Sequence, residues 1–574
     1  MLKNPLVQAL MTFGLSFGPL VPVFSYGVVP TMTKSHTFWE TWGGPLGLCL
    51  TLFMLSYTIG VVQPVMPPLV REFNSSVGYV QSALVLMSLV TASFIPTTEN
   101  LSRRLGRRPL LGIALLLYAL GLLVMILSPN IGIFTLGLAG LTGLGAAVLV
   151  STPVAMMDGL YQNEGARKYG LVALAIAGIL GSLTGSILGG VMAFDFSWRW
   201  AFAFELALIP AIWYLVRRVV VPTPVTTQGI DWVGGLLSVV GFGFTLVGLS
   251  LAAELGWWQP RADPQTLAFF LAPFGISIAP VLIASGLICI GLLIFWERQR
   301  SRQGYPPLLR LGVFNRRIYT IGLTIGTLHT MATVGVQFNL FQFIPAVVGL
   351  NPVQTAIAVI PFTLTQLVVL LVLAKRRPQF PPRYLLQLGL LIKSIGIALL
   401  MAAVRPPVTS LGLLPSLVVM GLGTGLFGTY ITSLTFADTS EAERAEARGV
   451  YRPFQNLGAS LGRGILGTVL VGTVSMKIVD GVVADLGESI DPLVRREAIR
   501  ALLVAIQTLR RSERQELFAE LPERVQPVLN SILQTAATEA MQLTLGVILG
   551  LCLLCLGLSC LLPKTVRTLE APIE

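Results

Sequence analysis

The sequence predicts an all-α integral membrane protein in which fourteen helices cross the bilayer. Of its 574 residues, 54% are hydrophobic and only 11% are charged, whereas soluble domains carry about 25% charged residues. Uncharged stretches of about 18 residues or more, long enough to span a membrane as helices, recur along the chain. Short basic clusters, such as the four arginines within residues 103–108, separate these stretches.

The fourteen segments follow one another from residue 45 to residue 563. We expect them at residues 45–70, 77–98, 109–127, 131–157, 170–194, 200–216, 232–253, 272–295, 318–346, 352–374, 384–404, 410–436, 449–475 and 538–563. A helix is the open-chain form that satisfies its own backbone polar groups in lipid. Prolines interrupt the uncharged run in residues 1–44, so we interpret that segment as an interfacial lead-in. If it spans instead, the N-terminus moves to the other side.

Lysine and arginine are unevenly divided between the two sides. The short loops on the side opposite the termini hold only Arg71, Arg199, Arg261 and Arg405. The positive-inside rule therefore predicts cytoplasmic termini in an inner or plasma membrane. The same asymmetry accounts for the net charge of +12, so no nucleic-acid partner is expected.

An internal repeat divides the chain into two similar parts. Residues 108–125 align with 383–400 at a shift of 275, SILGG at 186–190 aligns with GILGT at 464–468, and Gly143 aligns with Gly421. These matches predict six-helix bundles at residues 45–216 and 318–563, a linker at 217–317 that holds two extra central helices, and a tail at 564–574. Parallel halves with a substrate site between them are typical of transporters.

One long loop, residues 476–537, interrupts the C-terminal bundle on the side opposite the termini. Its stretches are amphipathic, and long loops cross the membrane regardless of their charge. We interpret it as a helical cap lying on the outer surface. The alternative is a vestibule lid or a docking site for a periplasmic adaptor.

The turn RRLGRRPLL resembles the loop signature of the major facilitator superfamily, Gly-x-x-x-Asp-Arg-x-Gly-Arg-Arg. The matching residues are Arg104, Gly106, Arg107 and Arg108, whereas Glu99 and Arg103 replace the Gly and Asp of the signature. The resemblance implies a major facilitator fold and a cytoplasmic gate built from charge pairs, with Asp158 as a candidate partner. The alternative is simple anchoring of the loop by its positive charges.

Three further stretches, at residues 197–205, 230–243 and 349–362, resemble the fourteen-helix drug:proton antiporter branch of that superfamily. GSLTGSILGG at 181–190 is similar to the glycine-rich motif of its fifth helix. Gly181, Gly185 and Gly189 share one helix face and Gly190 follows, an arrangement that suits close helix packing or a hinge.

Two residues depart from the pattern of that branch. The acid usual in its first helix is Thr58 here, and the arginine usual in its fourth helix is Ala139. Glu205 is an acid at membrane depth, about 8 Å beyond Trp200 along its helix. Because such residues are expensive in a bilayer, we interpret Glu205 as a candidate proton carrier. The alternatives are a salt bridge to Arg199 or a wet outer cavity.

The C-terminal bundle carries cations and polar side chains at membrane depth. The candidate cavity residues are His329, Thr333, Gln337, Lys393, Gln455 and Arg463. No acid lies at that depth in this bundle, so an anionic substrate group or a wet cavity is favoured over a closed ion pair. The polar stripe of the ninth span also suits simple contacts between helices.

The sequence offers no catalytic or cofactor site. Cys552 and Cys555 form a C-x-x-C pair without a nearby charge or histidine in sequence, so we interpret them as buried apolar residues. These observations predict a secondary active transporter, a proton-linked exporter of amphipathic organic molecules, rather than an enzyme. The alternatives are an exporter or flippase of a specific anionic metabolite or lipid, or a non-transporting sensor or scaffold.

Overall fold

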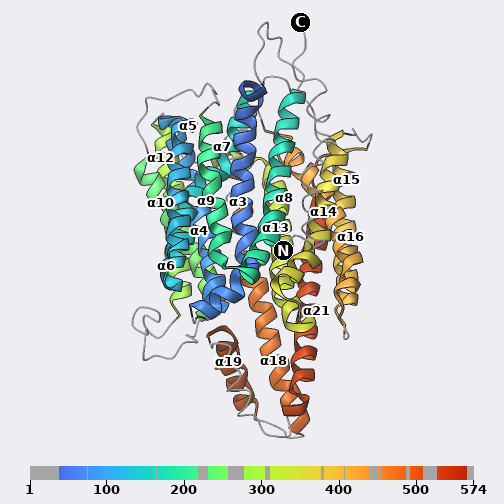
Figure 1. Cartoon of the computed structure of the whole chain (residues 1–574). Helices are drawn as coiled ribbons and strands as arrows, with labels where there is room; N and C mark the ends of the chain where they lie inside the picture. The colour runs from blue at the N-terminus through green and yellow to red at the C-terminus, as the bar shows by residue number, and fades with distance from the viewer. Residues whose placement is uncertain are drawn as a thin grey trace.

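The computed structural model describes most of the chain between residues 38 and 564. The described residues are 38–73, 75, 77–161, 164–217, 231–255, 277–303, 311–375, 380–405, 408–439, 447, 450–451, 454–459, 461–486, 491–508 and 526–564. The predictions for residues 1–37 and for the tail beyond residue 564 lie outside them. All regular elements in these ranges are helices (Figure 1).

The helices follow the predicted spans closely. They are α3 (Phe38–Glu72), α4 (Val77–Leu105), α5 (Arg107–Ile126), α6 (Ile131–Thr135), η1 (Leu136–Thr142), α7 (Gly143–Leu160), α8 (Glu164–Asp195), α9 (Trp198–Val216), α10 (Trp232–Leu255), α12 (Ile278–Arg302), η3 (Leu311–Asn315), α13 (Arg317–Phe343), η4 (Ile344–Val348), α14 (Pro352–Lys375), α15 (Pro382–Ala403), α16 (Ser410–Thr435), η5 (Gly462–Leu466), α18 (Gly467–Leu486), α19 (Pro492–Thr508) and α21 (Gln526–Ser559).

Twelve helical segments of the described ranges are long and apolar enough to cross a membrane. α4 and α10 contain shorter apolar segments, Leu86–Ile95 and Trp232–Thr245, and coincide with the second and seventh predicted spans. The all-helical membrane fold is therefore confirmed, and the arrangement is consistent with fourteen spans.

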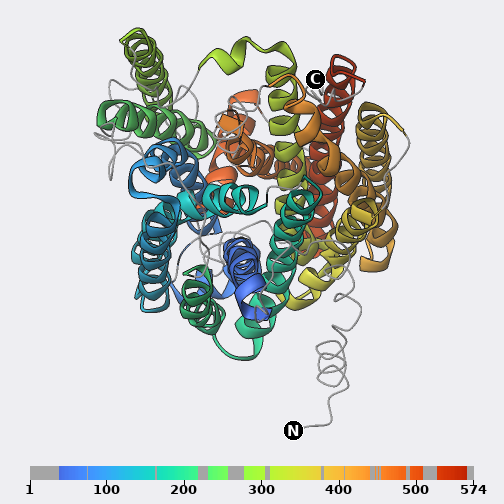
Figure 2. The same ribbon diagram turned by 90° about the horizontal axis from the view of Figure 1, so that it is seen from above.

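The buried apolar side chains separate into groups along the chain. One cluster joins α3 to α9, which we call the N-terminal half. Other clusters take their residues from the segments between η3 and α21, which we call the C-terminal half. α10 and α12 are central in the sequence but lie at the edge of the bundle, where α10 packs on α12 and α4 (Figure 2).

The glycine stripe of α8 sets the closest helix contact of the N-terminal half. A Cβ on Gly181 or Gly185 would collide with the backbone carbonyl oxygen of Phe53 or Tyr57 on α3, and one on Gly189 would lie 3.1 Å from the Cα of Val61. Small residues therefore let the two backbones approach. This stripe is a seam within one half.

The described parts of residues 476–537 project from the bundle and do not form the expected cap lying on its surface. α18 continues to Leu486 and α21 begins at Gln526, and the two helices pack together. With α19 they project from the face opposite the C-terminus, at the bottom of Figure 1. Ion pairs hold this projection: Lys477 with Glu539 at 2.7 Å, and Arg495 with Asp480 at 2.7 Å.

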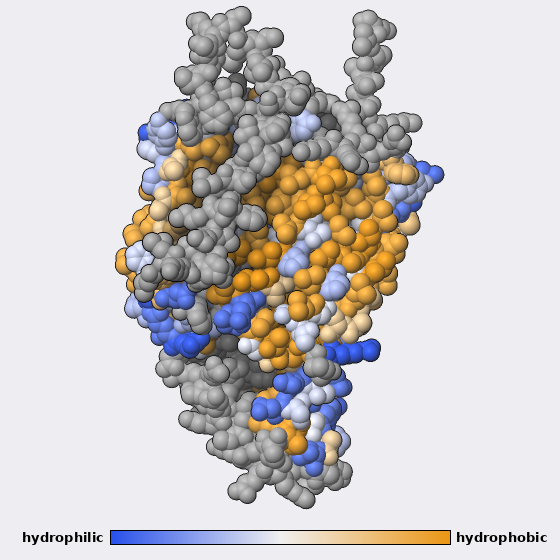
Figure 3. Space-filling view, turned by 45° about the vertical axis from the view of Figure 1, so that its right-hand side comes forward, coloured by the Kyte–Doolittle hydropathy of each residue, from blue (hydrophilic) through white to orange (hydrophobic). Residues whose placement is uncertain are grey.

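The outer surface of the helices is strongly apolar. Figure 3 shows an apolar band around the middle of the molecule and polar side chains on the projection below it. Leu116, Phe295 and Leu411 are each more than 60% exposed. Apolar surface of this extent is typical of contact with lipid.

Candidate functional site

Glu205 lies in a sealed polar cluster inside the N-terminal half. The hydroxyl of Thr58 on α3 donates a hydrogen bond to Glu205 Oε1, and the Tyr118 hydroxyl on α5 donates to the same oxygen at 3.1 Å. The Thr58 and Tyr118 hydroxyls also contact each other. All three side chains are fully buried. Three helices far apart in sequence thus converge on one carboxyl group.

No cation of the described residues forms an ion pair with Glu205. Both donors contact Oε1, while Oε2 has no hydrogen-bond partner among the described residues. A carboxylate in an apolar interior is costly unless it is paired. Hydroxyl groups both donate and accept, so they serve the charged and the protonated carboxyl alike. The arrangement therefore leaves one oxygen of a fully buried carboxyl group without a partner among the described residues.

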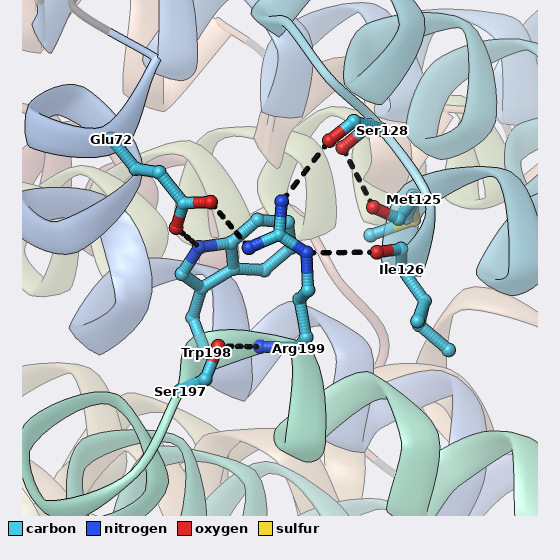
Figure 4. A network of polar contacts seen from close by, with 7 residues as sticks. All are labelled: Glu72, Met125, Ile126, Ser128, Ser197, Trp198 and Arg199. Carbon is cyan, nitrogen blue, oxygen red and sulfur yellow. Dashed lines mark hydrogen bonds and ion pairs between the residues drawn. The ribbon is translucent and has the colours of Figure 1, made fainter.

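The expected alternative, a salt bridge from Glu205 to Arg199, is wrong. Arg199 instead pairs with Glu72 at the end of α3 (Figure 4). Its Nε donates to the Ile126 carbonyl oxygen at 2.9 Å, and Trp198 Nε1 donates to Glu72 Oε2 at 2.5 Å. Arg199 therefore ties the ends of α3, α5 and α9 together on the face from which the α18–α21 projection extends.

The pKa of Glu72 reflects this contact. Partial burial acts to raise it, but the hydrogen bonds from Arg199 and Trp198 and the charge of Arg199 outweigh that effect and lower the pKa of Glu72 below its usual value. Glu72 is 43% exposed, so solvent screens the pair and its contribution to stability is modest.

Lys393 forms a second buried cluster, in the C-terminal half. Its Nζ lies 2.6 Å from Thr333 Oγ1 and 3.4 Å from His329 Nδ1, and the side chain is fully buried. The His329 ring stacks on Phe427 with ring centroids 3.7 Å apart. Lys393, His329 and Thr333 thus contact one another inside the half, between α13 and α15.

Arg463 lies at the contact between the two halves. It is 93% buried, and its guanidinium donates to Ser88 Oγ on α4. Its Nε has no partner among the described residues. A buried guanidinium without a counter-ion is unfavourable, so this position suits an anionic group.

A cavity of about 50 Å³ lies between the halves. Its polar lining includes Ser182 and Ser186 on α8, Gln337 on α13 and Thr363 on α14. Pockets for drug-sized ligands are usually about 300–1,000 Å³, so α8 and α14 must separate before such a molecule fits here. Of the predicted cavity residues, Gln337 lines this cavity. Gln455 is half-buried and is not part of the cavity lining.

The basic loop between α4 and α5 has a defined shape. Gly106 has φ 85° and ψ 148°, values essentially restricted to glycine, and it caps α5. Arg107 donates to the Ala155 carbonyl oxygen on α7 at 3.1 Å, while Arg104 and Arg108 are exposed. The side chain of Asp158 lies outside the described residues, so its expected pairing stays a prediction.

A sequence model of the Major Facilitator Superfamily matches residues 48–462, well over half of the chain. The chain belongs to this superfamily. Similar members include the multidrug efflux pump LfrA of Mycolicibacterium smegmatis, 23% identical over 441 residues, which cover 77% of this chain and 82% of that protein. Multidrug resistance protein Stp of Mycobacterium tuberculosis is 26% identical over 431 residues, with 74% and 75% coverage.

Solved structures show the same fold at low identity. The POT family transporter PepTSo is 12% identical, with a TM-score of 0.54 and coverage of 83% of this chain and 97% of that one. A bacterial homolog of the human lysosomal transporter Spinster is 15% identical, with a TM-score of 0.50 and coverage of 92% and 97%. This major facilitator protein is a secondary transporter of the plasma membrane and not an enzyme.

The sequence predicted Lys393 together with both of its partners, His329 and Thr333, as cavity residues, but it did not reveal the partners of Glu205. Thr58 was noted only as the residue in place of an acid, and Tyr118 was not singled out. Cys552 and Cys555 lie near Lys393 in the fold, although no charged residue is near them in the sequence. The internal repeat could have drawn attention to Tyr118, because the shift of 275 residues aligns Tyr118 with the buried Lys393.

Proposed function

We propose that this transporter exports amphipathic organic molecules in exchange for protons, and that Glu205 carries the proton. The observation that carries the proposal is the Glu205 cluster: a fully buried carboxyl group with two hydroxyl donors and, within the described part of the chain, no cation paired with it. A carboxyl group sealed in this way favours its protonated form and ionises when its surroundings become wet. The similarity to multidrug efflux pumps supports export of organic molecules.

Alternating access of the two halves is the transport mechanism that we infer. The separate apolar clusters of the halves and the small cavity between them support it. Gly190 of α8 packs against Val353 of α14, where an added Cβ would lie 3.1 Å from the Val353 Cα. Movement at this contact would enlarge the cavity and change the access of water to the polar clusters.

We further propose that the face with the Arg104–Arg108 turn is cytoplasmic. The positive-inside rule supports this orientation. The Arg107 contact with α7 supports the role of the turn in a cytoplasmic gate, in which Arg104, Arg108 and Asp158 would take part. The α18–α21 projection would then lie outside the cell membrane, where a periplasmic adaptor would contact residues 476–537.

Transport of anionic molecules is a second candidate, and Arg463 favours it. A buried guanidinium with an unpartnered Nε at the contact between the halves suits a carboxylate or phosphate group. An Arg463→Gln variant distinguishes the candidates. It would lose transport of anionic amphiphiles if Arg463 binds them, and it would retain transport of cationic ones.

The decisive experiment measures proton movement in proteoliposomes when a panel of cationic and anionic amphiphiles is added. Wild type should release protons on substrate addition, and Glu205→Gln should not. Glu297→Gln is the matched control, because Glu297 is a buried carboxyl group on α12, outside both halves. Unchanged proton movement in Glu205→Gln would exclude Glu205 as the carrier.

A further inference from the structure

An amine is enclosed in the C-terminal half without a carboxylate. Lys393 is fully buried, and the hydrogen-bond partners of its amine among the described residues are Thr333 and His329. No Asp or Glu of the described part of the chain forms an ion pair with it. A buried ammonium group that lacks a counter-ion is costly, whereas a neutral amine in the same place is not.

We propose that Lys393 and His329 form a second proton site, which gains and loses one proton independently of Glu205. Two basic nitrogens 3.4 Å apart in a sealed interior cannot both be charged at low cost. They therefore act as a coupled pair that holds at most one proton. Lysine suits this role because a buried ammonium can release its proton, whereas a guanidinium remains charged.

The partners of Lys393 accommodate both states of the amine. The Thr333 hydroxyl accepts a hydrogen bond from an ammonium group or donates one to a neutral amine. The neutral imidazole of His329 has the same freedom, because either tautomer is available to it. Stacking on Phe427 fixes the plane of the ring and keeps Nδ1 against the amine. No backbone or side-chain rearrangement is then needed when the proton leaves.

The remaining neighbours of the site are weakly acidic or apolar. α21 places the thiols of Cys552 and Cys555 within electrostatic range of Lys393, and both cysteines are buried. α16 contributes the Gly423 backbone and the Phe427 ring. His329 on α13 is the other titratable group. The thiols are neutral in their ordinary state, so they supply no counter-charge for an ammonium group.

The internal repeat relates this site to the Glu205 cluster. Gly145 packs against Tyr118 on α5, and Gly423 packs in the same manner against Lys393 on α15. These contacts support the shift of 275 residues that pairs Tyr118 with Lys393. On α8, Gly181 and Gly185 contact the carbonyl oxygens of Phe53 and Tyr57. In the C-terminal half, Gly458 and Gly462 contact those of Thr327 and Met331 in the same manner. These contacts pair Thr58 with Ala332, one residue from Thr333.

Each half then has one proton-binding group at equivalent depth, an acid in one and a base in the other. Protonation neutralises Glu205 and charges Lys393. The Lys393 site does not depend on Glu205 being the carrier, so either proposal can fail alone.

Nitrogen NMR of the imidazole tests the site directly, because the chain has only two histidines, His36 and His329. In a His36→Gln background, ¹⁵N-histidine labelling of the full protein in lipid reports His329 alone. We expect a single pH-dependent change of its ¹⁵N shifts between about pH 5 and pH 9. Glu205→Gln should leave that change in place, whereas Lys393→Met should remove or displace it.

Lys393→Arg is the second variant, because its guanidinium stays charged. In this variant residue 393 keeps its proton, so the ¹⁵N shifts of His329 should show no change caused by deprotonation at residue 393. This variant decides the question if Lys393→Met does not fold. The proposal is overturned if the wild-type signal is constant over this range. It is also overturned if Lys393→Met, or Lys393→Arg in its place, titrates as wild type does.

Discussion

The Thr58 hydroxyl donates a hydrogen bond to Glu205 Oε1 and so joins α3 and α9 across 147 residues of sequence. The antiporter pattern that the sequence resembles has an acid at this position of the first helix, where this chain has Thr58. In this protein a carboxyl group reaches the same point from α9.

Tyr118→Phe removes one hydroxyl donor to Glu205 with little change in volume. We expect substrate-driven proton flux in proteoliposomes to fall about tenfold, since a hydrogen bond to a charged group contributes about 1.5–3 kcal/mol. Tyr57→Phe is the control, because Tyr57 is another buried tyrosine whose hydroxyl donates to α9, in its case to the Ala201 carbonyl oxygen. Equal losses in the two variants would mean that the Tyr118 hydroxyl acts only through packing.

Gly185→Ala should destabilise the N-terminal half. The new Cβ would collide with the Tyr57 carbonyl oxygen, and overpacking of this kind costs about 1–3 kcal/mol. Gly550→Ala on α21 is the control, because no atom lies within 4 Å of its added Cβ. Thermal unfolding in detergent should show a lower melting temperature for the first variant and an equal or higher one for the second.

Gly106→Ala should destabilise the basic loop. The backbone conformation at Gly106 is nearly exclusive to glycine and costs another residue of the order of 1–3 kcal/mol. Gly112→Ala is the matched change within α5, where the nearest atom to an added Cβ is 3.7 Å away. Protease digestion of the loop should accelerate in the first variant only. Equal digestion rates would contradict the strained geometry of this turn.

Glu72→Gln should alter the acid stability of the protein. Because the pKa of Glu72 is lowered in the folded state, its pairing with Arg199 contributes stability above the usual glutamate pKa of about 4.3. That contribution is lost as the pH falls through the lowered value. Melting temperatures between about pH 3 and pH 7 should therefore decline less steeply in Glu72→Gln. The difference should be small, up to about 1 kcal/mol, since the pair is exposed. Parallel curves would show that the pair contributes nothing.

Sequence periodicity and hydropathy located the helices well, because lipid leaves a chain few alternatives to a helix. The ends of α18 and α21 were missed for a physical reason. Both helices continue past the apolar stretch into charged residues such as Lys477 and Asp480, which are stabilised by ion pairs rather than by lipid.

The candidate site was predicted less completely. Burial of Glu205 and Lys393 followed from their positions in apolar segments, but their partners lie on helices distant in sequence. Which side chains meet depends on the rotation of each helix about its axis, and the packing of α8 glycines on α3 fixes that rotation. Arg199 was likewise assigned to Glu205 because it is near in sequence, whereas the fold brings Glu72 to it.

Transferring the acid back to α3 tests the central claim most directly. In proteoliposomes, Glu205→Gln should abolish substrate-driven proton movement, and the double variant Thr58→Asp with Glu205→Gln should restore a measurable part of it. The account predicts this recovery because a carboxyl group at residue 58 would occupy the same buried cluster, beside Tyr118. Proton movement at the wild-type rate in Glu205→Gln alone would contradict it.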